Sequence, residues 1–96
     1  MIVPIKSQPA HLLVQDHLGD DIVEFTGLMN ANIEPIVHLR RAIRKFLHED
    51  PYRYSLDEVP VFRCKFETLA GITSAVFNGE ILETSKFHKN QGNTRQ

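Results

Sequence analysis

Residues 33–50 read I-E-P-I-V-H-L-R-R-A-I-R-K-F-L-H-E-D, the longest stretch of the chain with a regular helical spacing of apolar residues. At about 100° per residue, the apolar side chains of this stretch gather on one arc of a helix. An arc of this kind is typical of a helix that lies on a hydrophobic core. The members of the arc are Ile36, Leu39, Ala42, Ile43, Phe46 and Leu47.

The ends of this helix can be predicted as well. Asn30 or Asn32 can accept hydrogen bonds from the free N–H groups of the first turn. Pro35 is tolerated near the start, where N–H groups have no helical partner. Pro51 disfavours helical geometry at Asp50 and should stop the helix. We therefore expect a helix of up to 18 residues within positions 33–50.

Basic residues gather on the opposite arc of the same helix. We call this group the basic face and define it as His38, Arg41, Arg44, Lys45 and His48. A stripe of cations is the first requirement for binding a polyanion, because neutralising phosphates supplies most of the affinity. The competing interpretation is a solvated helix surface, balanced by Glu34 and Glu49 or covered by the acidic N-terminal third. The basic face is the candidate site for a protein partner or a polyanion.

The N-terminal part of the chain leaves two interpretations open. Residues 11–27 can form a β-hairpin that turns at Leu18-Gly19-Asp20, and residues 22–26 are strand-like in either case. The alternative places a helix on residues 8–18, capped by Ser7 and stopped by Gly19. We favour the hairpin, with residues 1–6 as a further short strand and residues 7–10 as a turn or linker.

The C-terminal part predicts more strands. Phe62, Cys64 and Phe66 alternate with charged residues, as in a strand with one buried face. Residues 72–77 and 80–86 flank Asn78-Gly79, a strong hairpin signal because both residues accept the positive φ of a type I′ turn. This pattern predicts a three-stranded antiparallel meander against which the helix packs. The expected fold class is therefore α+β, with one principal amphipathic helix on an antiparallel sheet.

Length and composition bound the rest. The 96 residues suit one domain, which we expect to span residues 1–88, with a flexible polar tail at 89–96. The net charge is −1, but residues 1–32 hold one base and four acids, whereas residues 33–65 hold seven bases and five acids. A single cysteine excludes an intrachain disulfide and favours a reducing cytoplasm. No stretch is long enough for a membrane span, and no signal peptide is evident.

The sequence holds little that predicts catalysis. Cys64 lies between two phenylalanines on the face expected to be buried, where a thiol is inert. His38 and His48 are ten residues apart, unlike the close pairs of zinc sites. Asp20-Asp21 and Asp57-Glu58 lie in predicted turns, and Ser55 to Glu58 has capping-box spacing, which allows one helical turn. We expect no metal or cofactor and a chain that is not an enzyme.

Three functions follow as hypotheses. The first is a small intracellular interaction or regulatory protein without catalysis that acts as a homodimer, because the core is thin and the strand edges expected at residues 1–6 and 80–86 need covering. The second is a nucleic-acid-binding module that uses the basic face. The third is a small-ligand sensor: the order of hairpin, helical connection and strands resembles PAS-like sensor domains in topology alone. Its pocket would be lined by Ile43, Leu47, Phe62 and Phe66.

Overall fold

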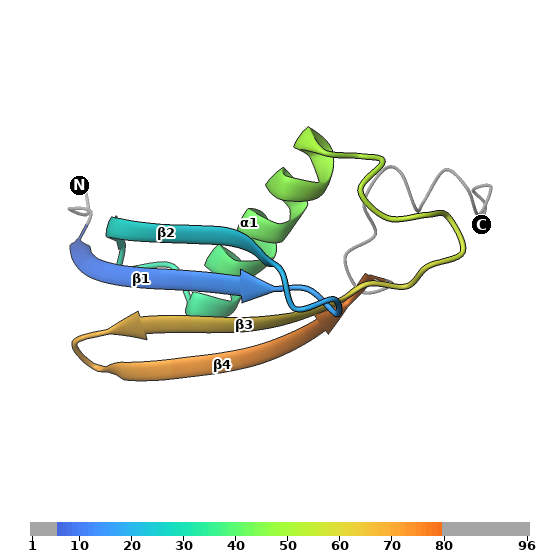
Figure 1. Ribbon diagram of the computed structural model, residues 1–96. Helices are drawn as coiled ribbons and strands as arrows, with labels where there is room; N and C mark the ends of the chain where they lie inside the picture. The colour runs from blue at the N-terminus through green and yellow to red at the C-terminus, as the bar shows by residue number, and fades with distance from the viewer. Residues whose placement is uncertain (1–5, 80–96) are drawn as a thin grey trace, which may run out of the picture.

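The structure is a computed structural model that describes residues 6–79, and within this range it contains four strands and one helix (Figure 1). The sheet has the order β2-β1-β3-β4, and every neighbouring pair is antiparallel. The α+β fold class with one principal helix on an antiparallel sheet is confirmed. The elements are β1 (Ser7–Gln15), β2 (Asp21–Asn30), α1 (Pro35–Glu49), β3 (Val61–Thr68) and β4 (Gly71–Asn78).

The first hairpin is formed by β1 and β2. Leu12 lies opposite Phe25 in this pair, so the hairpin is confirmed and the alternative helix on residues 8–18 is wrong. The turn depends on Gly19, whose φ of +88° is readily accessible only to glycine. Residues 7–10 are not a linker, because they form the first part of β1 and pair with 27–30. Pro9 is tolerated there because it lies beyond the end of the β1–β3 ladder, which starts at Ala10.

Helix α1 lies across one face of the sheet and packs on β2, β1 and β3 (Figure 1). On the side of α1 that faces the sheet, Leu39 and Ile43 are completely buried, and Leu47 is 5% exposed. The sheet contributes alternate side chains from its two central strands, as expected when one sheet face is covered. These are Ala10, Leu12, Val14, Phe62, Cys64 and Phe66.

The helix begins and ends close to its two prolines. Pro35 occupies the first turn, and Asp50 is the C-cap that precedes Pro51. The predicted asparagine cap is wrong: Glu34 is the N-cap residue and makes no side-chain capping bond. The Asn30 side chain instead accepts from the N–H of Asn32 at 2.8 Å, in the turn that leads into the helix.

The second hairpin is formed by β3 and β4. The buried and exposed alternation predicted for residues 62–67 is confirmed, and so is the strand at 72–77. The chain turns at Leu69-Ala70, and Gly71 adopts a φ of +140°. The antiparallel neighbours β1, β3 and β4 are broadly consistent with the predicted meander.

Several predicted features fall at or beyond the limits of the description. The strand at 80–86, the strand at 1–6 apart from Lys6, the domain limit at residue 88 and the tail at 89–96 lie outside the described residues. Among the described glycines, Gly79 lacks the positive φ that a type I′ turn at Asn78-Gly79 requires. Its N–H donates instead to the carbonyl of Pro60 at 2.8 Å, which holds the end of β4 beside the start of β3.

Candidate functional site

Four members of the basic face are exposed on α1. Arg41, Arg44, Lys45 and His48 all point away from the core-facing side of the helix. Their positions follow the spacing i, i+3, i+4 and i+7, so they are neighbours along one strip about two turns long. The strip forms one continuous cationic surface on the outer side of the helix.

The fifth member, His38, does not belong to this surface. Its side chain is buried, with only 8% of the residue exposed, so its predicted place on the solvent arc is wrong. The imidazole stacks on the ring of Phe66, with centroids 5.5 Å apart and planes 7° apart. Nε2 lies 2.9 Å from the carbonyl of Asn30, and a carbonyl only accepts, so Nε2 is the donor. His38 therefore joins the start of α1 to β2 and β3 as part of the core.

The exposed cations differ in their ionic contacts. Lys45 Nζ lies 3.7 Å from Glu49 Oε2, an exposed pair one helical turn apart. Neither Arg41 nor Arg44 forms an ion pair or hydrogen bond with any side chain of residues 6–79. An exposed pair such as Lys45–Glu49 contributes little and leaves the lysine available. The net charge of the strip is therefore largely uncompensated by the described part of the chain.

The acidic residues of the N-terminal third are engaged elsewhere. Asp21 accepts from Gln15 at 2.7 Å, and Glu24 lies 2.9 Å from His11 Nε2 on the open face of the sheet. Asp20 pairs with Arg53 at 3.1 Å. Among the described residues, the acids at positions 16–24 therefore do not cover the basic face, as one interpretation of the sequence allowed.

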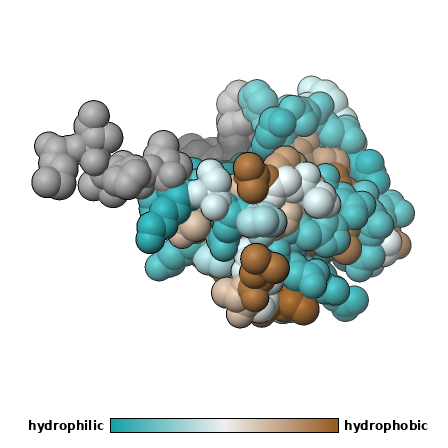
Figure 2. Space-filling model, turned by 90° about the vertical axis from the view of Figure 1, so that its left-hand side faces the viewer, coloured by the Kyte–Doolittle hydropathy of each residue, from teal (hydrophilic) through white to brown (hydrophobic). Residues whose placement is uncertain are grey.

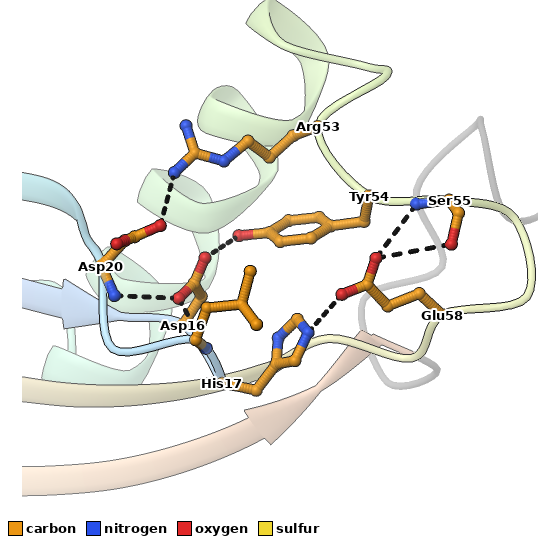
Figure 3. Close-up of polar contacts among 8 residues, drawn as sticks. Asp16, His17, Asp20, Arg53, Tyr54, Ser55 and Glu58 are labelled. Atoms are coloured by element: carbon orange, nitrogen blue, oxygen red, sulfur yellow. Dashed lines mark hydrogen bonds and ion pairs between the residues drawn. The ribbon is translucent and has the colours of Figure 1, made fainter.

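A second polar cluster joins the β1–β2 turn to the loop that follows α1 (Figure 3). We call it the loop clamp and define it as Asp16, His17, Asp20, Arg53, Tyr54 and Glu58. The Tyr54 hydroxyl donates to Asp16 Oδ2 at 2.8 Å, and both residues are at most 3% exposed. Asp16 Oδ1 accepts from the N–H groups of Leu18 and Asp20 at 2.9 and 3.0 Å. The buried carboxylate is thus held by three donors.

The outer part of the loop clamp contains a histidine–carboxylate contact and an arginine–carboxylate pair. His17 Nε2 contacts Glu58 Oε2, and the imidazole also lies against the Tyr54 ring at 5.5 Å between centroids. Glu58 Oε1 accepts from the N–H of Ser55 at 3.2 Å. The capping-box spacing therefore predicted the contact between Ser55 and Glu58 correctly. Residues 55–58 are not helical, however, and form a simple turn. Arg53 lies over the ring of Phe46 as well as beside Asp20, so it ties the loop to the end of α1.

The hydrogen bonds of the loop clamp change the acidity of its members. Burial alone would raise the pKa of Asp16, but the bonds from Tyr54, Asp20 and Leu18 outweigh burial and hold it below its ordinary value. Burial and the bond to Asp16 raise the pKa of Tyr54. The bonds from His17 and Ser55 lower the pKa of Glu58. Because the clamp's carboxylates are held by donors of the protein itself, we assign the cluster a structural role.

Other candidates from the sequence lie in the core or in separate places. Burial raises the pKa of Cys64 to about 11, and its thiol points at the carbonyl of Phe62 at 3.8 Å, as an inert buried cysteine does. The four residues predicted to line a ligand pocket are core members that are at most 5% exposed. In the described part of the chain, no three His, Cys, Asp or Glu side chains are grouped so that they could hold a metal ion. The helix of this part is also too short and too polar to cross a membrane.

Comparisons with models of protein families, with curated proteins and with solved structures each give no match. The geometry of the described residues is therefore the basis for a functional proposal.

Proposed function

We propose that this chain is a small non-catalytic interaction protein that acts as a homodimer and binds an acidic partner through Arg41, Arg44, Lys45 and His48. The observation that supports this most directly is the absence of any ionic partner for Arg41 and Arg44 among residues 6–79. Its single cysteine is compatible with the cytoplasm, where we expect the protein to act.

The chemistry of the strip suits carboxylates or phosphates. Arginine presents a planar fork of donors that can bind a carboxylate or phosphate through two parallel hydrogen bonds. Arg41 and Arg44 lie one turn apart, so a partner with two acidic groups could engage both at once. Lys45 adds a more mobile charge beside them, and its weak bond to Glu49 is easily exchanged.

A nucleic acid is the second candidate partner. The strip lies on the side of α1 that faces away from the sheet, and the acids at positions 16–24 are occupied elsewhere. A phosphate backbone would meet the same cations, with an affinity that falls steeply as salt rises. An acidic protein segment is the leading candidate because this short strip can neutralise only a few phosphates, and the affinity for a nucleic acid grows with the number of phosphates neutralised.

Fluorescence anisotropy can test both partners. The probes are a labelled poly-glutamate peptide and a labelled DNA duplex of about 20 base pairs, titrated over about 50 to 300 mM salt. We expect the double variant Arg41→Glu with Arg44→Glu to weaken binding of the preferred probe by about tenfold or more, because two attractive contacts become repulsive. For DNA, removing two phosphate contacts should also lower the salt slope by about 2.

The matched control makes the same charge change on the sheet. Arg63→Glu with Lys65→Glu alters two exposed bases on β3, on the face that α1 does not cover. This control should retain affinity within about threefold, with the small difference due to net charge. Equal losses in the two double variants would mean that only net charge matters, and binding of neither probe by the wild-type protein would remove the acidic-partner proposal.

A further inference from the structure

Among residues 6–79, strand β4 is an edge of the sheet, and it contains no charged residue. Its sequence, G-I-T-S-A-V-F-N, also lacks proline over all eight positions. Within residues 6–79, β3 is its only neighbour in the sheet. Natural edge strands usually hold lysine, proline or a bulge that prevents pairing with another chain. An uncharged edge of this length is open to strand addition.

The two sides of β4 are both accessible to a neighbour. Ile72 and Val76 are 59% and 65% exposed on the open face of the sheet, and Ser74 is exposed between them. On the other face, Thr73 is exposed, and α1 packs over β2, β1 and β3. Apolar side chains are visible at the lower rim of the molecule in Figure 2, the side on which Figure 1 places β4.

We propose that β4 pairs antiparallel with β4 of a second copy about a two-fold axis at Ser74, which joins two four-stranded sheets into one of eight strands. Side chains alternate between the two faces along a strand, and opposite residues of an antiparallel pair share a sheet face. A two-fold axis must therefore pair even-numbered residues with even-numbered residues, and odd with odd. An axis at Ser74 places Ile72 opposite Val76 of the partner subunit, and Val76 opposite Ile72 of the partner subunit. Apolar β-branched pairs of this kind stabilise antiparallel strands.

A second copy fits this edge better than it fits the other one. Self-pairing at β4 opposes no charges, because all eight residues of the strand are uncharged. Strand β2, the other edge among the described residues, contains Asp21 and Glu24, charged side chains of the kind that discourage an edge strand from pairing with another chain. The inference rests on the proposed homodimer and names its interface. Both copies of α1 would lie on the same side of the joined sheet and present two basic strips in one direction.

Opposite charges placed at the axis provide the test. In the single chain, residue 74 lies opposite Lys65 of β3, so Ser74→Glu adds a favourable neighbour and keeps the fold. In the dimer, the same variant sets two carboxylates directly against each other. We expect Ser74→Glu alone and Ser74→Lys alone each to weaken dimerisation by about tenfold or more, because like charges are opposed. Sedimentation velocity and light scattering over a concentration series measure the dissociation constant of the full chain.

Mixing the two variants makes the result specific. Ser74→Glu and Ser74→Lys chains mixed in equal amounts should form a heterodimer at concentrations where each alone is monomeric. Thr26→Glu, an exposed position on β2, is the matched control and should dimerise as the wild type does. If the wild type and Ser74→Glu dimerise equally, the β4 interface is wrong while the homodimer stands. A monomeric wild-type chain at all concentrations overturns both, and a mixture of folded variants that stays monomeric overturns the pairing.

Discussion

The Tyr54 hydroxyl donates a 2.8 Å hydrogen bond to the buried carboxylate of Asp16, two residues that are 38 positions apart in the sequence. The bond joins the β1–β2 turn to the loop between α1 and β3, as Figure 3 shows. That loop contains no regular helix or strand, so its position depends on contacts of this kind.

Tyr54→Phe should therefore reduce the free energy of unfolding. The ring remains packed against Phe62, but one buried oxygen of Asp16 loses its donor. A buried acceptor left without a partner costs about 1–3 kcal/mol. Urea denaturation followed by circular dichroism measures the change. Tyr52→Phe, at a residue that is 89% exposed on the same loop, is the control and should cost less. Equal free energies for the wild type and Tyr54→Phe would show that the bond contributes no net stability.

Acid should weaken the fold through the loop clamp. The pKa values of Asp16 and Glu58 are lowered in the folded chain, so the unfolded chain binds protons first as the pH falls. The stability from each group is present above its ordinary pKa of about 4, and it is lost as the pH falls through the lower folded value. Asp16→Asn should be less stable than the wild type near neutral pH and should lose less on acidification.

Urea denaturation between about pH 7 and pH 3 tests this dependence, since each additional proton bound by the unfolded state adds about 1.4 kcal/mol per pH unit to the slope. Asp57→Asn, an exposed position in the same loop, controls for the loss of one carboxylate. A wild-type slope that Asp16→Asn leaves unchanged would assign the acid sensitivity to other groups.

The elements predicted best from the sequence are those whose burial is periodic. Helix α1 and strand β3 were predicted because one side of each packs on the core, and the apolar spacing records this directly. Residues 7–10 were misassigned because Ser7 and Pro9 are typical of turns. Their place in β1 depends on pairing with residues 27–30, which local propensity does not record.

The candidate sites show the same limit. The sequence pattern correctly placed Arg41, Arg44, Lys45 and His48 on an exposed arc, but it placed His38 there too. Near its start α1 meets the end of β2, so a wider arc is buried than the spacing alone implies. The loop clamp was missed because His17 and Glu58 are 41 positions apart. Only the spacing of Ser55 and Glu58 hinted at any of its contacts.

His38 should act on stability and not on binding. His38→Ala removes the stacking on Phe66 and the donor to the Asn30 carbonyl, and we expect a loss of about 1–3 kcal/mol in the free energy of unfolding. His48→Ala, on the exposed strip, should change stability by about 0.5 kcal/mol or less. Affinity for the acidic probe should fall more in His48→Ala than in His38→Ala when both variants are measured well below their melting temperatures. If folded His38→Ala lost more affinity than His48→Ala, the assignment of His38 to the core alone would be wrong, and this histidine would belong to the binding surface.

Substitutions of Gly19 and Gly27 test two different costs of adding a side chain. At Gly19 the cost is backbone strain, and at Gly27 it is steric crowding. Gly19 has a φ of +88° and open space around it, so Gly19→Ala should cost about 1–2 kcal/mol from conformation alone. Gly19→Asn should cost less, because asparagine tolerates the left-handed region.

An added Cβ at Gly27 would lie 2.9 Å from the ring of Phe25, which is 43% exposed and able to turn away. Alanine also lowers the entropy of the unfolded chain, so Gly27→Ala should cost less than Gly19→Ala. Thermal melts of the three variants give the order, and a Gly27→Ala variant less stable than Gly19→Ala would show that the Phe25 ring is held rigidly on β2.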